Sequence, residues 1–337
     1  MTITASFPVH DASGVATVRR AAVLAAERHA FSAAQAGRVA LVATELATNL
    51  HKHARGGEIL IRLLEQPSEP EGIEILSIDR GPGIRDLAAA RRDGHSTAGT
   101  LGHGLGAVER QADLFEIYSR PSGTVAVARI LKERDAQPSH ALTAVRIGAV
   151  LVSMPGEQVC GDGLAWHVRR DRVSVLVVDG LGHGLQAHDA ARAAVAAFGR
   201  VAADPPAAAL GAVHEAMRHT RGGAAAVLAL DLDRGVARFA GLGNIAGVIL
   251  PDTGARRGLV SMNGTAGHGA PRIQEFVTPA PKGAVIVMHS DGIATQWHLD
   301  AYASLRAYHP SLTAAVLYRD FSRRRDDVAV VVVGERT

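Results

Sequence analysis

A short polar segment divides this 337-residue chain into two stretches whose hydrophobic patterns differ. The segment, residues 132–140 (KERDAQPSH), is charged and contains a proline, which is typical of a linker. Helical and strand spacings alternate before it, whereas short β-type segments predominate after it. The length also suits two domains of ordinary size. We therefore predict one domain at residues 1–131 and a second at residues 141–337, joined by this linker.

The spacing of apolar residues predicts the α/β (α+β) fold class for both domains. In the first domain, strands are predicted at residues 2–9, 57–64, 72–78, 114–119 and 123–131, and helices at residues 14–28, 32–53, 85–91 and 104–111. Ser32 is the expected N-cap of the second helix. In the second domain, strands are predicted at residues 145–152, 164–168, 173–178, 225–231, 236–240, 246–250, 273–278, 284–289 and 328–333, and helices near residues 186–201, 206–218 and 312–322. This second pattern predicts a sandwich of mostly antiparallel sheets.

Composition limits the classes of function to consider. Hydrophobic residues make up 47% of the chain, so each domain can bury a core, and small aliphatic side chains must fill it because only 4% are aromatic. The net charge is +3, but basic and acidic residues are interleaved. The densest basic run, residues 323–325, is followed at once by Asp326 and Asp327. We therefore expect no nucleic-acid partner.

Three features of the sequence predict a cytoplasmic protein. Cys160 is the single cysteine, so no internal disulfide can form, which fits a reducing compartment. The N-terminus has no basic start followed by an apolar core, and hence no signal peptide is expected. No apolar run reaches the roughly 18–20 residues that span a bilayer. We therefore expect no membrane association.

Two segments of the first domain carry residues suited to a nucleotide. Glu45 and Asn49 are four residues apart on a predicted helix and so share one face. A carboxylate and an amide placed there can orient a water or hydroxyl and bind Mg²⁺ beside phosphates. Asp79 directly follows a predicted strand, where its carboxylate can accept a hydrogen bond from an adenine amino group. Gly81 and Gly83 beside it allow the base to approach the backbone.

A third segment, GHGLG at residues 102–106, opens a predicted helix. Free backbone N–H groups at the N-terminus of a helix favour anionic phosphate. Taken singly, each of the three segments is more often ordinary structure: an exposed helix face, a turn or a flexible loop. Their order and spacing together predict an ATP site in residues 1–131.

These segments resemble the GHKL ATPase superfamily, which includes sensor histidine kinases and Hsp90-type ATPases. Over DRGPGI and DGHSTAGTLGHGLGAVERQADLFEI they are similar to the small anti-sigma-factor serine kinases, in particular the RsbT-like stressosome switch kinases. The resemblance implies a Bergerat-fold α/β sandwich that binds Mg-ATP, with Glu45 as catalytic base and Asn49 as Mg²⁺ ligand. It also implies two groups of nucleotide-binding residues, one at the adenine (Asp79, Gly81, Gly83) and one in a lid near the phosphates (Gly102, Gly104, Gly106). No phosphoacceptor histidine segment precedes Glu45, which argues against a histidine kinase.

Aspartates in the second domain lie where predicted strands begin or end. Asp162 precedes one strand, Asp179 and Asp291 each follow another, and the pair Asp326 and Asp327 precedes the last. A strand end can aim an acidic side chain into a common site while the strand packs behind it. Such hard oxygen ligands suit Mg²⁺ or Mn²⁺, and two such ions can activate a water for in-line attack on a phosphoryl group. One Asp-Gly pair alone is more often a turn, but four such positions together predict a two-metal hydrolytic centre.

The motifs VDGLGHG (residues 178–184), SDGI (residues 290–293) and RRRDDVAVVVV (residues 323–333) resemble the metal-dependent protein phosphatase (PPM) family, in its SpoIIE/RsbX-like branch. The likeness covers about residues 141–337. It implies an αββα sandwich that holds two Mn²⁺ or Mg²⁺ ions and hydrolyses phosphoserine or phosphothreonine. The implied metal ligands are Asp162, Asp179, the Gly180 carbonyl, Asp291 and Asp326, with Asp327 left open as the alternative to Asp326.

Two features beside these motifs also require interpretation. The first motif departs from the usual Gly-Gly-Asp of the family, because Cys160 replaces the leading glycine. Gly161 is retained, so we expect metal binding to survive. The segment GLGN at residues 241–244 also looks like a family loop, and we assign it a structural role.

Together the two resemblances imply a bifunctional regulator of a stress-response partner switch. Its second domain would dephosphorylate STAS-type antagonist proteins, and its first domain would phosphorylate such partners on serine or threonine. A downstream sigma-factor regulator is left open as a further partner. Two alternatives also stay open: the first domain is a non-catalytic, ATP-dependent module that sequesters a partner, or the chain has lost one activity and serves as a scaffold.

Overall fold

The computed structural model describes residues 4–67, 69–91, 104–133, 145–269 and 272–335. The chain forms two compact units, an N-terminal unit of residues 4–65 and 69–137 and a C-terminal unit that takes in residues 138–337. The linker proposed at residues 132–140 lies largely outside the described residues, and its bounds stay a prediction. None of the described helices is long and apolar enough to cross a membrane.

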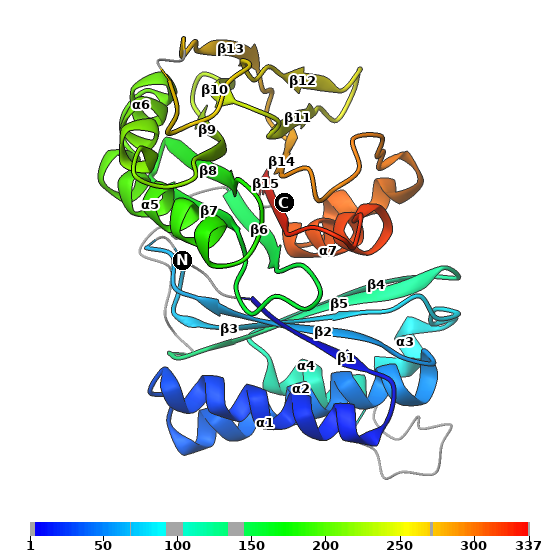
Figure 1. The fold of residues 1–337 in the computed structure, drawn as a ribbon. Coiled ribbons are helices and arrows are strands. Elements are labelled where there is room, and N and C mark those ends of the chain that lie inside the picture. Colours follow the sequence, from blue (N-terminus) through cyan, green and yellow to red (C-terminus); the bar gives the residue numbers. More distant parts are fainter. Residues whose placement is uncertain (1–3, 68, 92–103, 134–144, 270–271, 336–337) are drawn as a thin grey trace. The chain divides into compact units, whose positions relative to one another are not determined.

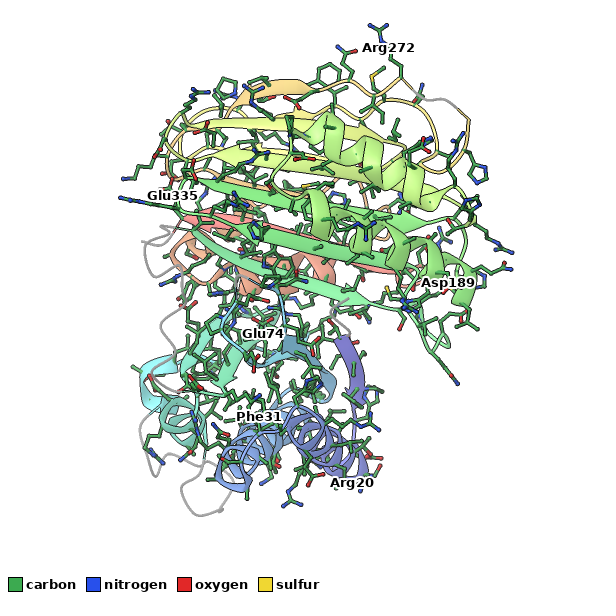
Figure 2. The ribbon with its side chains drawn as sticks, turned by 90° about the vertical axis from the view of Figure 1, so that its left-hand side faces the viewer. Arg20, Phe31, Glu74, Asp189, Arg272 and Glu335 are labelled. Carbon is green, nitrogen blue, oxygen red and sulfur yellow. The ribbon has the colours of Figure 1, made fainter. Side chains whose placement is uncertain are left out.

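The N-terminal unit is a five-stranded antiparallel sheet with helices on one face (Figure 1). The sheet has the order β1-β2-β3-β5-β4 and consists of β1 (Thr4–Val9), β2 (Gly57–Leu64), β3 (Gly72–Ile78), β4 (Leu114–Arg120) and β5 (Gly123–Leu131). The helices are α1 (Ala12–Arg28), α2 (Ala33–His53), α3 (Leu87–Arg91) and α4 (Leu105–Gln111). Apolar side chains of α1 and α2 share one core with those of β2, β3 and β5. Phe31, labelled in Figure 2, belongs to this core.

Local sequence accounts for where the two long helices begin. The Ser32 side chain accepts a hydrogen bond from the Gln35 backbone N–H, and the Gln35 side chain accepts one from the Ser32 backbone N–H, which makes a capping box. Asp11 caps α1 by accepting from the Gly14 backbone N–H. The predicted N-cap at Ser32 is therefore confirmed.

The C-terminal unit contains two five-stranded antiparallel sheets packed face to face. The first, in the order β13-β10-β9-β8-β7, consists of β7 (Asp162–Val168), β8 (Arg172–Gly180), β9 (Gly223–Asp231), β10 (Val236–Leu242) and β13 (Phe276–Pro279). The second, in the order β12-β11-β14-β15-β6, consists of β6 (Val145–Val152), β11 (Ala246–Leu250), β12 (Arg257–Leu259), β14 (Val285–His289) and β15 (Val328–Glu335). Apolar side chains from both sheets form one core between them.

Helices cover the outer faces of this sandwich (Figure 1). They are α5 (Leu185–Val201) and α6 (Pro206–Met217) on the first sheet, and α7 (Pro310–Phe321) on the second, preceded by the 3-10 helix η1 (Asp300–Ala307). Small residues bring the helices close to the strands: a Cβ added to Gly148 in β6 would lie 2.0 Å from the Ser311 nitrogen of α7. The predicted α/β class and the αββα arrangement are confirmed.

The structure differs from the expected elements in a few places. β12 and η1 are not expected from the sequence, because a strand of three residues and a kinked 3-10 helix show neither strand nor α-helical periodicity. β7 begins two residues earlier than expected and β8 ends two residues later. Asp162 is therefore the first residue of β7 and Asp179 the last residue but one of β8, so both lie at strand ends as expected, although within the paired strands.

Candidate metal centre and nucleotide site

Asp162 and Asp179 face each other across two paired strands. The antiparallel register of β7 and β8 sets Asp162 directly opposite Asp179, an arrangement that brings facing Cβ atoms to about 5 Å. Asp162 is only 2% exposed, and its Oδ2 atom has no hydrogen-bond partner. Like charges directly opposite each other destabilise a sheet, and a buried carboxylate oxygen without a partner is costly. A positive charge between the two side chains would relieve both costs.

Asp291 and Asp326 reach the same end of the sandwich from the second sheet. Asp291 follows β14 by two residues, and Asp326 precedes the neighbouring strand β15 by two. Burial, followed by the charges of Asp291, Asp326 and Asp327, raises the pKa of Asp179 to about 7. The aspartates of both sheets therefore lie within electrostatic reach of one another.

The pKa values of two further carboxyl groups are raised as well. Burial, and next the charge of Asp179, raises the pKa of Asp162 well above its usual range. Burial, and next the charge of Asp326, raises the pKa of Asp291. Within the described residues, however, no three His, Cys, Asp or Glu side chains already form a metal-ligand set. The centre is thus a cluster of buried, mutually repelling carboxylates rather than a closed cage.

A hydrogen bond holds one of these carboxylates in place, and a hydroxyl group affects another. The Ser290 hydroxyl accepts from the Ala329 backbone N–H (3.0 Å), and Ser290 lowers the pKa of Asp162 against the larger effect of burial. The Asn244 side-chain amide donates to Asp291 Oδ2 over 2.8 Å. Asn244 is not among the expected site residues, because the GLGN segment is assigned a structural role and nothing local to it points to Asp291, 47 residues further along the chain.

Asp326 and Asp327 have different surroundings. Asp327 is 3% exposed, and its two oxygens accept backbone N–H groups from Met154 (2.7 Å) and Gly161 (2.8 Å). Asp326 is half-buried, and its Oδ1 atom accepts the Asp327 backbone N–H over 3.0 Å. Asp327 therefore anchors the segment between Met154 and Gly161, whereas no backbone N–H of the described residues donates to Asp326 Oδ2.

Gly180 and Gly161 lie close together beside the aspartates. The Gly180 backbone N–H donates to the Gly161 carbonyl over 3.1 Å. A Cβ on Gly180 would lie 2.3 Å from the Ala187 carbonyl oxygen of α5, so no larger residue fits there. This contact fixes the backbone directly after Asp179.

The predicted adenine residues form one turn in the N-terminal unit. Asp79, which is 9% exposed, follows β3, and its Oδ1 atom accepts the backbone N–H groups of Gly81 (2.7 Å) and Thr124 (3.0 Å). Gly83 has a φ of 72°, and a Cβ there would lie 2.1 Å from the Arg120 carbonyl oxygen. The backbone itself therefore requires glycine at Gly83, and Thr124 is a neighbour of Asp79 that the sequence did not reveal.

Four of the remaining predicted nucleotide residues lie on two helices or at the start of one. Glu45 and Asn49 are both half-buried on α2. A Cβ on Gly81 would lie 2.8 Å from the Cα of Ala54, so the end of α2 closely approaches the turn after Asp79. Gly104 is the N-cap of α4 and Gly106 is buried in its first turn. Gly102 lies outside the described residues.

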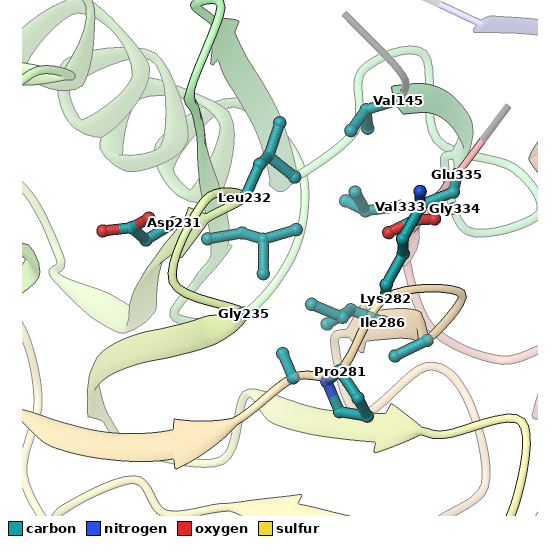
Figure 3. Close-up of a pocket in the computed structure, with 13 residues that line it drawn as sticks. Val145, Asp231, Leu232, Gly235, Pro281, Lys282, Ile286, Val333, Gly334 and Glu335 are labelled. Atoms are coloured by element: carbon teal, nitrogen blue, oxygen red, sulfur yellow. The ribbon is translucent and has the colours of Figure 1, made fainter.

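A shallow pocket opens at a different place in the C-terminal unit (Figure 3). Val145, Leu232, Pro281, Lys282 and Glu335 are among the residues that line it. Strand register places it at the opposite end of the sandwich from the aspartates, because Val145 pairs with Glu335 while Val152, at the other end of β6, pairs with Val328. Figure 2 likewise shows Glu335 and Asp189 of α5 at opposite ends. This mostly apolar pocket does not contain the carboxylates.

Comparison with known families matches each of the two units to a different family. Residues 9–130 match the family of histidine kinase-like ATPase domains. Residues 169–335 match the family of stage II sporulation protein E (SpoIIE). The chain joins a histidine kinase-like ATPase domain to a SpoIIE domain. The two family resemblances inferred from the motifs are confirmed.

Three individual proteins show how far the likeness extends. The serine/threonine-protein kinase RsbT of Bacillus subtilis (strain 168) is 36% identical over 89 residues, which are 26% of this chain and 66% of the kinase. One solved structure comes from work on the bacterial stressosome, described there as a modular system adapted to control secondary messenger signaling. The match to it spans 56% of this chain and 98% of that chain, with a TM-score of 0.53 and 27% identity. RsbX in complex with magnesium covers 57% of this chain and 95% of its own, with a TM-score of 0.51 and 18% identity, which shows a shared fold.

Proposed function

We propose that the SpoIIE domain is a phosphatase that hydrolyses phosphoserine and phosphothreonine with two divalent cations, Mg²⁺ or Mn²⁺. The observation that carries the proposal is the pairing of Asp162 with Asp179 inside one sheet, with Asp291 and Asp326 arriving from the other. Clustered carboxylates that repel one another can all stay ionised only beside positive charge, which divalent cations would supply.

The residues present fit such cations. Carboxylate oxygens are the hard ligands that Mg²⁺ and Mn²⁺ prefer. The Oδ2 atom of Asp162 is buried and has no hydrogen-bond partner, so it is available as such a ligand. RsbX, which shares the fold, was solved in complex with magnesium. In our proposal Asp162, Asp179, Asp291 and the Gly180 carbonyl are ligands. Asp326 is preferred over Asp327 as the fourth carboxylate, because backbone N–H groups engage both oxygens of Asp327.

The protein's own groups prepare the site for hydrolysis. Bound divalent ions would lower the pKa of a water molecule and neutralise charge on the phosphoryl group. Asn244 fixes the carboxyl group of Asp291, so that this ligand presents an oxygen in a defined direction. The Asp327 carboxylate accepts the Gly161 backbone N–H, and the Gly161 carbonyl accepts that of Gly180. These two hydrogen bonds hold the backbone beside Asp179 in position.

We further propose that the ATPase domain binds Mg-ATP and acts as a serine/threonine kinase of STAS-type partners. Asp79, Gly81 and Gly83 would bind adenine, Asn49 would bind Mg²⁺ and Glu45 would act as the catalytic base. The lid glycines Gly102, Gly104 and Gly106 would lie near the phosphates. Likeness to the kinase RsbT over 89 residues supports this assignment. In the alternative, the domain binds ATP without phosphotransfer and sequesters its partner.

The physiological setting we propose is a cytoplasmic, stress-response partner switch. The phosphatase would act on a phosphorylated STAS-domain antagonist, and a sigma-factor regulator would respond downstream. The likeness to RsbT and to a stressosome structure supports this setting.

Incubation of the full chain with a phosphorylated STAS protein, followed by intact mass measurement, tests the phosphatase. We expect loss of phosphate with Mn²⁺ or Mg²⁺ and none in EDTA. Cation binding is checked separately by tryptophan fluorescence in wild type and in Trp166→Phe, which leaves Trp297 as the single reporter. The Trp297 indole N–H donates to His289, the residue before Ser290 and Asp291. Full hydrolysis in EDTA would contradict the proposal.

A further inference from the structure

The backbone of a basic residue, Arg323, is held beside the loop that carries Asp291. The Arg323 backbone N–H donates to the Gly292 carbonyl over 2.8 Å, and Ser322 pairs with Ile293 in an isolated bridge. These contacts brace the segment before β15 against the loop that carries Asp291. Consistent with this position, the charge of Arg323 lowers the pKa of Asp291.

The guanidinium of Arg323 is not used by the fold. Arg323 is exposed, and among the described residues its side chain makes no hydrogen bond, ion pair or ring contact. Its neighbour Arg324 differs, because its guanidinium lies 5.8 Å from the centre of the Tyr318 ring. The backbone thus places a cation beside the carboxylates without committing its five N–H donors to them.

The negative charge of the aspartates gives a guanidinium at the edge of the centre a role in binding substrate. A phosphate monoester carries close to two negative charges at neutral pH, and the carboxylates of Asp179, Asp291 and Asp326 would repel it. Cations held by the aspartates would offset this repulsion within the centre. A guanidinium at its edge adds opposite charge together with paired N–H donors, whose fork matches phosphate oxygens.

We propose that Arg323 binds the phosphoryl group of the substrate and thereby selects phosphate monoester dianions over neutral or singly charged esters. This inference rests on the proposed phosphatase function and extends it to substrate recognition. The same contact would retain inorganic phosphate, so the product should inhibit the enzyme through Arg323. Arg323 contributes binding and orientation, whereas the attacking water is activated at the aspartate centre.

Kinetics of Arg323→Ala and Arg323→Lys in the full chain with Mn²⁺ test this role. Two substrates are compared, a phosphoserine protein and the small aryl ester p-nitrophenyl phosphate, together with inhibition by inorganic phosphate. Loss of one charge-assisted contact predicts KM and the inhibition constant for phosphate to rise roughly 10-fold to 100-fold in Arg323→Ala, with a smaller change in kcat. Arg323→Lys should recover part of the loss, because it keeps the charge but not the fork.

Arg325→Ala is the matched control, since it removes an equal charge from the same exposed segment two residues away. The control should keep the wild-type KM for both substrates. Equal behaviour of Arg323→Ala and Arg325→Ala would overturn the inference. So would an effect confined to the phosphoprotein, which would mean that Arg323 contacts the protein chain and not the phosphoryl group.

Calorimetric titration of the Mn²⁺-loaded chain with inorganic phosphate separates this inference from the function on which it rests. Weaker phosphate binding in Arg323→Ala, with unchanged Mn²⁺ affinity, is the expected result. If wild type hydrolyses neither substrate, the proposed phosphatase function fails. If wild type is active but Arg323→Ala binds phosphate as tightly as wild type does, the inference alone fails.

Discussion

The two domains hold their candidate site residues in different ways. In the SpoIIE domain, Asp162 and Asp179 face each other across β7 and β8, so the hydrogen bonds of a sheet set their separation. In the ATPase domain, the residues lie on a helix and in a turn, which meet where Ala54 approaches Gly81. A fixed register suits cations, whose bonds to oxygen are short and directional, whereas a helix and a turn can surround a larger nucleotide.

This comparison predicts that a small change at the metal centre has the largest effect. Asp179→Asn should abolish phosphatase activity, because it removes both a ligand oxygen and its charge. The same change should stabilise the chain in EDTA, raising Tm by roughly 2–4 °C for about 1 kcal/mol of relieved repulsion. Activity assays and thermal unfolding in EDTA measure the two effects. Asp189→Asn, exposed on α5, is the control, and a lower Tm in Asp179→Asn would contradict the proposed charge repulsion.

The second largest effect is expected at Glu45, and it distinguishes the kinase from the binding module. Glu45→Ala should lower the rate of partner phosphorylation by about 10²–10⁴-fold, as removal of a general base does, while ATP still binds. Intact mass of the partner and calorimetry with Mg-ATP provide the two readouts. Glu27→Ala, on the exposed side of α1, should change neither. Unchanged phosphorylation in Glu45→Ala would favour the alternative of a non-catalytic module.

A more moderate effect is expected at Asp79. Asp79→Asn keeps one oxygen to accept the N–H groups of Gly81 and Thr124, but it replaces the other oxygen by an amide donor. ATP affinity should fall roughly 10-fold to 100-fold while Tm stays close to that of wild type. Calorimetric titration of the full chain with Mg-ATP measures the change. Wild-type affinity in Asp79→Asn would remove Asp79 from the adenine site.

The smallest effect is expected at Asn244, which supports a ligand without being one. Asn244→Ala should weaken Mn²⁺ activation by about 10-fold, because Asp291 loses the amide that orients its Oδ2 atom. The Mn²⁺ concentration that gives half-maximal activity is the measurement. Asn263→Ala, exposed in a nearby loop, should leave that concentration unchanged. A shift of equal size in both variants would mean that Asn244 has no specific role at Asp291.

Elements whose residues alternate regularly were predictable from the sequence. The bounds of β2, β3, β5, β6 and β11 agree with the expected strands, because strand and helix periodicity is written in neighbouring residues. The motif residues of both sites were identified for a related reason, since an aspartate beside a glycine after an apolar run is a local pattern. Their roles as ligands, base and adenine contacts stay predictions that the variants above test.

Features that depend on neighbouring residues can be expected from the sequence, whereas features that depend on distant residues cannot. The capping box at Ser32 belongs to the first kind, because its partners are three residues apart. The difference between Asp326 and Asp327 belongs to the second, because Asp327 accepts a hydrogen bond from Met154, 173 residues earlier. Asn244 reaches Asp291 in a comparable way, through two loops that the sheets bring together. Sequence patterns therefore identified which residues could form the sites, whereas tertiary hydrogen bonds decided which oxygen atoms the backbone occupies and which it leaves for a ligand.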